Sequence, residues 1–327
     1  MKRLFIVILG LAFIILLSGC AKDDSLIEDN INSDYIEEEY NLEVEGGEIR
    51  GTIMIPQNGN KSTVALIIAG SGPTDRNGNN PSAGNNNSVK MIGEALAKEG
   101  IYSVRYDKRG IGESASLVER EEDLIFEDYI NDVVKWIEKL KQDGRFDKII
   151  VIGHSEGALI GAAAVARADV DGFVSVAGMG YPAYDTLARQ LKVQSEKVYN
   201  LCVPILEELK KGNRVDDVPE GLYSLFRPSV QPYLISWFKY DPAKEISKVD
   251  EPVLIIQGDN DIQITVEDAK ILHKSNQRSK LVIIGGMNHI LKDAPEDREG
   301  NLATYSNPDL PLNQQFVEEL TKFINDL

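Results

Sequence analysis

The sequence contains few of the residues that build disulfides and metal sites. Two cysteines, Cys20 and Cys202, and three histidines occur among its 327 residues. It has no C-x-x-C or H-E-x-x-H spacing, no Walker A lysine, and no G-x-G-x-x-G that opens a helix at a first βα turn. We therefore predict neither a metal nor a cofactor. Cys202 is expected to be a buried small apolar residue without a chemical role.

Positive charge and long apolar runs are also scarce. Lys and Arg number 35 against 52 Asp and Glu, which gives a net charge of −17. This excess argues against nucleic acid and against anionic membrane surfaces as electrostatic partners. An uncharged run, Leu4–Leu17, has 14 residues, which is short of the roughly 20 that a membrane span needs. With 43% hydrophobic residues, the chain can bury a sizeable core.

The N-terminus has the layout of a signal peptide, because Lys2 and Arg3 precede this apolar run. The run ends in Leu-Ser-Gly-Cys, residues 17–20, which resembles the bacterial lipobox. The resemblance implies a lipoprotein signal peptide over 1–19 and a lipid on Cys20. The protein would then be held at the bacterial cell membrane, facing outside the cytoplasm. The polar, acidic residues 20–34 are predicted to be a tether. An uncleaved signal anchor is the alternative interpretation.

Residues 35–327 have the pattern of a folded domain. Segments 35–44 and 47–56, with Gly46 and Gly47 at the turn, predict an antiparallel hairpin. Six short, mostly continuous apolar runs suit parallel strands buried on both faces: VALIIAG, YSVRYD, KIIVIG, FVSVAG, PVLIIQG and KLVIIGG. Helical patterns lie at 88–99, 124–142, 156–168, 265–275 and 311–326. This alternation predicts an α/β fold with a mostly parallel central sheet and helices on both faces.

Two segments interrupt the alternation. Residues 181–248 hold no strand-like run, so we predict a helical cap insertion over the ends of the strands. Its segment LFRPSVQPYLISWF, residues 225–238, is expected mainly to pack the insertion onto the body, with a pocket lining as the alternative. The Asn- and Gly-rich stretch at 76–88 predicts a long flexible loop.

A candidate nucleophile, Ser155, lies in the G-x-S-x-G pattern of residues 153–157. The strand-like run IIVIG precedes it and a small-residue helix follows, which is the strand-to-helix context of a nucleophile elbow. Gly153 and Gly157 are expected where neighbouring backbone comes too close for a Cβ. A serine hydroxyl is a poor nucleophile until a base takes its proton. The sequence therefore has to supply a histidine.

His289 is the predicted base, because it follows the strand-like run KLVIIGG and catalytic groups gather at the carboxyl ends of such strands. His154 adjoins the serine and should point away from it. His273 lies in a charged helix and is expected at the surface. A carboxylate must orient the base, and Asp259 and Asp261 both follow the run PVLIIQ. Either could orient the histidine, while the other takes a turn role.

Backbone N–H groups should form an oxyanion hole. The residue after the nucleophile, Glu156, supplies one donor. The loop that follows VALIIAG supplies the second, with Ser71 preferred and Gly72 as the alternative.

Together these motifs resemble the α/β-hydrolase superfamily, specifically bacterial serine hydrolases with a serine-aminopeptidase-like (S33-type) domain. The matching segments, in the family's order, are AGSGPTDRNG, RYDKRGIGES, GHSEGALIG, QGDNDIQI and GMNHIL. The resemblance implies an α/β-hydrolase fold and selects Asp261 as the acid. It also implies that Asp107, Lys108 and Arg109 shape a loop through local hydrogen bonds.

The expected activity is hydrolysis of a small-molecule carboxylic ester by Ser155, His289 and Asp261. The acidic chain and apolar insertion predict a neutral or cationic ester. An aminopeptidase or amidase is the first alternative, with Glu207, Glu208, Asp216 and Asp217 as candidate anchors for an α-amino group. Thioester hydrolysis is another alternative, and a lipoprotein that only binds its ligand is the non-enzymatic one.

Overall fold

The computed structural model describes residues 34–58 and 62–327. The predicted signal peptide, the lipidation site Cys20 and almost all of the tether lie outside the described residues. Among those described, no helix is both long and apolar enough to cross a bilayer.

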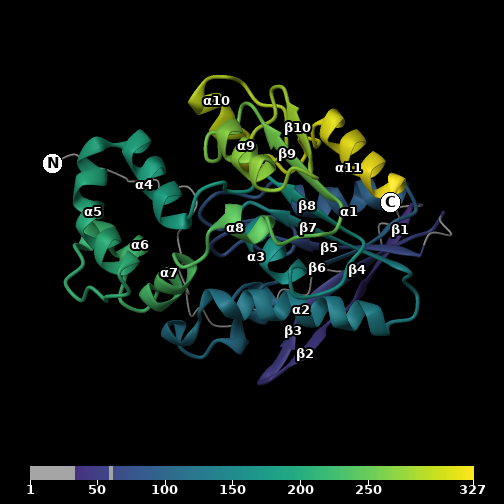
Figure 1. Ribbon diagram of the computed structural model, residues 1–327, viewed down its shortest axis with the longest axis horizontal. Coiled ribbons are helices and arrows are strands. Elements are labelled where there is room, and N and C mark those ends of the chain that lie inside the picture. The colour runs from purple at the N-terminus through teal and green to yellow at the C-terminus, as the bar shows by residue number, and fades with distance from the viewer. Residues whose placement is uncertain (1–33, 59–61) are drawn as a thin grey trace, which may run out of the picture.

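An eight-stranded sheet forms the centre of the molecule, in the order β1-β4-β6-β5-β7-β8-β9-β10 (Figure 1). All six runs predicted as parallel strands pair in parallel, and β4 joins the sheet antiparallel to β6. The strands are β1 (Tyr35–Glu39), β4 (Gly51–Pro56), β5 (Thr63–Ile68), β6 (Tyr102–Tyr106), β7 (Lys148–His154), β8 (Gly172–Val176), β9 (Val253–Gly258) and β10 (Lys280–Ile284). The parallel sheet predicted from the continuous apolar runs is therefore confirmed.

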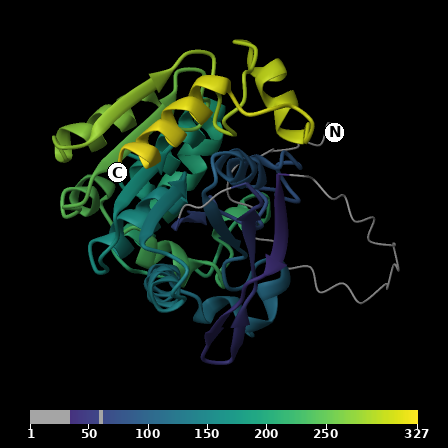
Figure 2. The same ribbon diagram turned by 90° about the vertical axis from the view of Figure 1, so that its right-hand side faces the viewer.

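The predicted N-terminal hairpin is present and forms two ladders. Strands β2 (Leu42–Val44) and β3 (Gly47–Ile49) pair antiparallel around the glycine turn, where Gly46 has φ 89°. Beyond them β1 pairs antiparallel with β4 at the edge of the main sheet. Figure 2 shows the β2–β3 ribbon projecting from the body.

Helices cover both faces of the sheet. One face carries α2 (Phe126–Gln142), α3 (Glu156–Val165) and α9 (Val266–Ser275), and the other carries α1 (Ser88–Lys98) and α11 (Gln314–Asp326). The closest helix, α3, is buried over its whole length. Its small side chains permit this approach, and a Cβ on Gly161 would lie 2.8 Å from the Phe173 ring.

The interval 181–248 is helical and contains no strand, as predicted. It comprises α4 (Ala183–Gln194), α5 (Glu196–Lys210), α6 (Tyr223–Phe226), α7 (Gln231–Trp237) and α8 (Pro242–Ile246). Figure 1 shows α4, α5 and α6 beside the sheet rather than on its faces. Its segment 225–238 mainly packs, because Phe126 of α2 stacks on Trp237 at 5.9 Å between ring centroids. Short elements complete the fold: η1 (Gly112–Leu117), η2 (Glu121–Asp123), η3 (Glu220–Leu222), α10 (Arg298–Ala303) and η4 (Thr304–Ser306).

The Asn-rich stretch at 76–88 is a loop with a network of side-chain to backbone hydrogen bonds. Asn79 Oδ1 accepts from the backbone N–H groups of Asn86 and Asn87, both at 2.9 Å. Asn80 Oδ1 likewise accepts from Ser82 at 2.9 Å, and its side chain is buried. Asparagine side chains here take the place of backbone partners, as they do in Asx turns, while the flexibility of the loop stays a prediction.

Candidate active site

Ser155 lies at a strained turn between β7 and α3, with φ 56° and ψ −119°. A Cβ on Gly153 would lie 2.2 Å from the carbonyl oxygen of Gly157, and one on Gly157 would lie 2.4 Å from that of Ile68. Both glycines are therefore required by backbone contact, as the sequence predicted. The Ser155 N–H donates to the Val176 carbonyl at 2.9 Å, which ties the turn to β8.

His289 reaches this serine from the loop after β10. Its Nε2 lies 3.1 Å from Ser155 Oγ, and its Nδ1 lies 2.7 Å from Asp261 Oδ2. Pairing of Gly258 with Ile284 aligns the carboxyl ends of β9 and β10, so the loops that carry Asp261 and His289 are neighbours. The structure thus brings the three predicted residues into one hydrogen-bonded row.

The Asp261 carboxylate is buried and saturated with donors. Besides His289, the Gln257 side chain donates to Oδ2 at 3.1 Å, and the N–H groups of Gln263 and Ile264 donate to Oδ1 at 2.7 and 2.9 Å. A carboxylate only accepts, so Nδ1 of His289 carries the proton and Nε2 faces the serine as an acceptor.

Asp259 takes the turn role that the sequence left open between the two aspartates. Its Oδ1 accepts from the Gly286 N–H at 2.7 Å, and its own N–H donates to the Ile284 carbonyl at 3.0 Å. Asp259 therefore braces the loop that leads to the histidine. The geometry places Asp261, not Asp259, on His289.

The other two histidines stand apart from the serine hydroxyl. His154 Nε2 lies 2.8 Å from the backbone oxygen of His289, and burial lowers the pKa of His154 to about 4. It is neutral at pH 7 and supports the histidine loop. On α9, His273 Nδ1 lies 2.8 Å from Ser279 Oγ in the loop after the helix, and the His273 side chain is half-buried rather than fully solvated.

Both residues predicted to supply oxyanion donors adjoin the serine. Ser71 and Glu156 line one small cavity together with Ser155. Glu156 is the first residue of α3, where backbone N–H groups have no partner within the helix. Gly70 brings the other loop close, because a Cβ on it would lie 3.3 Å from Ser155 Cβ.

The Glu156 side chain makes contacts that the sequence did not predict. Its Oε2 pairs with Lys108 Nζ at 2.8 Å, and its Oε1 accepts from the Tyr233 hydroxyl of α7. Lys108 Nζ also donates to the Gly70 carbonyl at 2.7 Å. Asp107 accepts locally, from the Glu113 N–H at 3.0 Å, but it also pairs with Arg76, and Arg109 pairs with Asp132 of α2, so these side chains are not held by local hydrogen bonds alone. The Lys108 side chain likewise reaches beyond its own loop, from the end of β6 to Gly70 after β5 and to α3.

A second buried lysine, Lys292, was also missed. Its Nζ donates to the carbonyl of Asn86 at 2.6 Å and to that of Asn307 at 2.8 Å. Burial lowers the pKa of Lys292 to about 8, so it stays mostly protonated at neutral pH. It ties the His289 loop to the Asn-rich loop. A lysine in a polar loop carries no sequence signal of burial.

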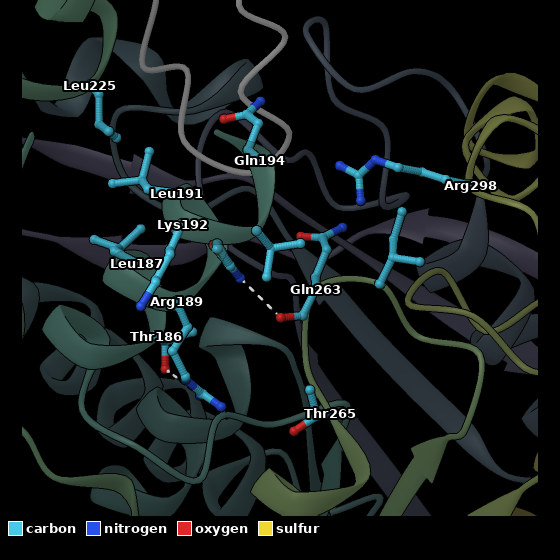
Figure 3. A pocket seen from close by; sticks show the side chains of 13 residues that line it. Thr186, Leu187, Arg189, Leu191, Lys192, Gln194, Leu225, Gln263, Thr265 and Arg298 are labelled. Carbon is cyan, nitrogen blue, oxygen red and sulfur yellow. Dashed lines mark hydrogen bonds between the residues drawn. The ribbon is translucent and has the colours of Figure 1, made fainter. Parts of the chain in front are cut away.

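Three cavities meet at Gln263, which lines each of them. Two are small and contain Ser155. The third has a volume of about 320 Å³ and runs along α4. Figure 3 shows Leu187 and Leu191 on its α4 side and Arg298 reaching in from the opposite side. Thr186, Leu187 and Gln190 line both this cavity and the one at Ser155, so the two are adjacent. Within the described ranges, no three His, Cys, Asp or Glu side chains are grouped as metal ligands would be.

The sheet, the helices on both faces and the turn at Ser155 define the α/β-hydrolase fold, as the motifs predicted. Solved structures agree with this assignment. Est1E from Butyrivibrio proteoclasticus, with ferulic acid bound, has a TM-score of 0.61 at 18% identity, over 88% of this chain and 98% of that one. An acylaminoacyl peptidase from Pyrococcus horikoshii has a TM-score of 0.55 at 14% identity, over 89% of this chain and 42% of that one. The fold is thus shared by Est1E and by an acylaminoacyl peptidase.

Sequence comparison also supports an α/β-hydrolase. The family model described as serine aminopeptidase, S33, matches residues 84–223, which include Ser155 but neither Asp261 nor His289. The esterase EstD of Thermotoga maritima is 28% identical over 270 residues. That alignment covers 79% of this chain, and the chain spans 62% of the length of that relative.

Proposed function

We propose that the protein is a serine hydrolase that cleaves carboxylic esters. The observation that carries the proposal is the row from Ser155 Oγ through His289 to Asp261, at 3.1 and 2.7 Å, beside a cavity that can hold substrate. Similarity to the esterase EstD supports the ester bond as the target.

In this mechanism Ser155 Oγ attacks the ester carbonyl carbon while His289 Nε2 takes its proton. Asp261 keeps the imidazole in the required tautomer and stabilises its cationic form. The N–H groups of Ser71 and Glu156 donate to the oxyanion. His289 then gives the proton to the leaving alcohol, and water hydrolyses the acyl-enzyme by the same steps.

The large cavity supports a neutral substrate over a cationic one. Its walls are mainly apolar, and its charged members are Arg189, Lys192 and Arg298. Among the described residues that line it, none is Asp or Glu. The cavity therefore offers nothing to bind a cation, although the chain as a whole is acidic. We propose an ester whose apolar part lies along α4.

The same lining disfavours the aminopeptidase alternative, which needs an acidic anchor for an α-amino group. Glu207 accepts from the Tyr184 hydroxyl, and Glu208 pairs with Lys211 at 2.9 Å. Neither these two nor Asp216 and Asp217 line any of the three described cavities that meet at Gln263.

A fluorophosphonate probe and a substrate panel test the proposal. The folded protein beginning after Cys20 should be labelled and should turn over p-nitrophenyl acyl esters, and Ser155→Ala should lose both, with kcat falling roughly 10⁶-fold. Faster turnover of aminoacyl p-nitroanilides than of esters would instead support the peptidase. Acyl thioesters are assayed in the same panel as the third class of substrate. A wild-type protein that is neither labelled nor active would support a binding lipoprotein.

We also propose that a lipid on Cys20 anchors the protein to the outer side of the bacterial cell membrane. The support is the basic, apolar and Leu-Ser-Gly-Cys pattern of residues 2–20. Cells grown with an alkyne fatty acid should label the wild-type protein but not Cys20→Ala. Equal labelling of both would overturn the proposal.

A further inference from the structure

We infer that Lys108 is a positioning residue for the oxyanion hole, acting through the Gly70 carbonyl and the Glu156 carboxylate. The inference rests on the proposed function and adds a residue to which no role in that reaction has been given. Lys108 touches neither Ser155 nor the predicted substrate cavity. Its side-chain hydrogen bonds go to the two segments that supply the predicted donors.

The first contact orients a peptide group. Lys108 Nζ donates to the Gly70 carbonyl at 2.7 Å. That carbonyl and the N–H of Ser71 belong to one planar trans peptide, so the two groups point in opposite directions. Holding the oxygen therefore sets the direction of the Ser71 N–H. An ammonium on the carbonyl also polarises the peptide and strengthens the N–H as a donor. Thr74 Oγ1 restrains the next peptide, because it donates to the Ser71 carbonyl at 2.7 Å.

The second contact holds the other donor. Glu156 provides its backbone N–H beside Ser155, while its carboxylate pairs with Lys108 at 2.8 Å. The Tyr233 hydroxyl of α7 donates to the other oxygen. Both side chains of the ion pair are almost fully buried, at 1% and 2% exposed. One ammonium group thus connects the two halves of the oxyanion hole, and Tyr233 connects them to the insertion.

Burial and surroundings make this arrangement rigid. The Lys108 ammonium also lies 4.9 Å from the centre of the Tyr129 ring. Burial raises the pKa of Tyr233 well above its usual value, so its hydroxyl remains a donor. With its charge paired and its donors directed, Lys108 has little freedom to leave the Gly70 carbonyl. The oxyanion donors are therefore in place before substrate arrives, which is what electrostatic preorganisation requires.

A neighbouring ion pair offers a matched control. Arg109 Nη2 pairs with Asp132 at 2.5 Å, and the Asp132 side chain is 2% exposed. This pair is one residue from Lys108 but joins the loop to α2, and its side-chain hydrogen bonds run from Arg109 to Asp132, away from Gly70, Ser71 and Ser155. Loss of either pair costs stability, whereas only loss of Lys108 loosens the oxyanion donors.

The experiment compares Lys108→Met with Arg109→Met, with kcat expressed per fluorophosphonate-titrated serine. We expect kcat of Lys108→Met to fall about 10- to 100-fold with KM within about twofold, because removal of a whole oxyanion donor costs about 10²–10³. A trifluoromethyl ketone, whose serine adduct carries an oxyanion, should lose affinity by the same factor. Arg109→Met should retain kcat per active serine within about twofold.

If Lys108→Met does not fold, the double variant Lys108→Met/Glu156→Gln removes both charges and leaves no unpaired buried carboxylate. It should show the same fall in kcat and in ketone affinity. Unchanged kcat per active serine in the folded variant, or an equal fall in Arg109→Met, would overturn the inference. Failure of the proposed function is distinct, because the wild-type protein would then show neither labelling nor ester turnover.

Discussion

His154 Nε2 lies 2.8 Å from the backbone oxygen of His289, and the two rings are 4.9 Å apart between centroids. Because a carbonyl oxygen only accepts, Nε2 of His154 carries a proton and donates. The residue before the candidate nucleophile therefore supports the backbone of the candidate base. This contact joins the ends of β7 and β10, which lie three strands apart in the sheet order.

The buried His154 predicts a loss of stability in mild acid. Burial lowers its pKa in the folded state to about 4, from 6.5 in the unfolded chain. The unfolded state then binds more protons between these values, so the stabilisation is complete above pH 6.5 and is lost as the pH falls towards 4. The loss from this group is about 3 kcal/mol. His154→Gln lacks the titrating group, so urea unfolding should show the wild-type advantage shrinking from pH 7 to pH 4.5. A constant difference across that range would contradict the assignment.

The two aspartates after β9 should differ sharply in their effect on activity. Asp261→Asn presents an amide to His289 Nδ1 and favours the wrong tautomer, so kcat for ester hydrolysis should fall roughly 10³–10⁴-fold. Asp259→Asn can keep its bond to the Gly286 N–H and should remain within about threefold of the wild type. Steady-state kinetics of both variants decide the matter, and an inactive Asp259→Asn would show that the assignment is reversed.

Gly157 should not tolerate a methyl group. A Cβ there would lie 2.4 Å from the Ile68 carbonyl, so Gly157→Ala should destabilise the fold by about 3 kcal/mol and displace Ser155. Gly221→Ala is the matched control, because a Cβ there has no neighbour within 4 Å. Chemical denaturation measures both changes. Similar unfolding midpoints for the two variants would show that α3 can move away from β5.

Filling the large cavity should shorten the acyl chains that are accepted. Leu187 is buried between this cavity and the one at Ser155. Leu187→Trp should lower kcat/KM for p-nitrophenyl octanoate about tenfold relative to the acetate. Leu201→Trp, at a residue of α5 that is 53% exposed, serves as the control. An unchanged chain-length profile would place the acyl group elsewhere.

Removal of the Lys292 ammonium should loosen the loops around the site. Lys292→Met leaves the Asn86 and Asn307 carbonyls without this donor, so hydrogen exchange should accelerate in 76–88 and 288–293. Exchange in α11 should not change, which distinguishes local opening from global unfolding. Unaltered exchange in both loops would mean that the asparagine network alone holds them.

Local pattern was enough to predict the architecture. Continuous apolar runs specify strands buried on both faces, and such strands occur in parallel sheets because helices must cover both sides. The glycines around Ser155 and the order of serine, aspartate and histidine were equally visible, since each residue type follows from the chemistry of a turn or a proton transfer. The same reasoning did not predict the hydrogen bonds of the Asn-rich loop, because composition does not show which side chains find backbone partners.

The order of residue types was enough to name the candidates for the site: Ser155, His289 and one of two aspartates. The family resemblance selected Asp261, and the tertiary structure shows the contact itself: Asp261 faces His289 Nδ1, whereas Asp259 faces the Gly286 N–H. It also revealed Lys108, whose partners lie 38 and 48 residues away along the chain. Contacts of this kind depend on strand register and side-chain reach, and neither is written in the local order of residues.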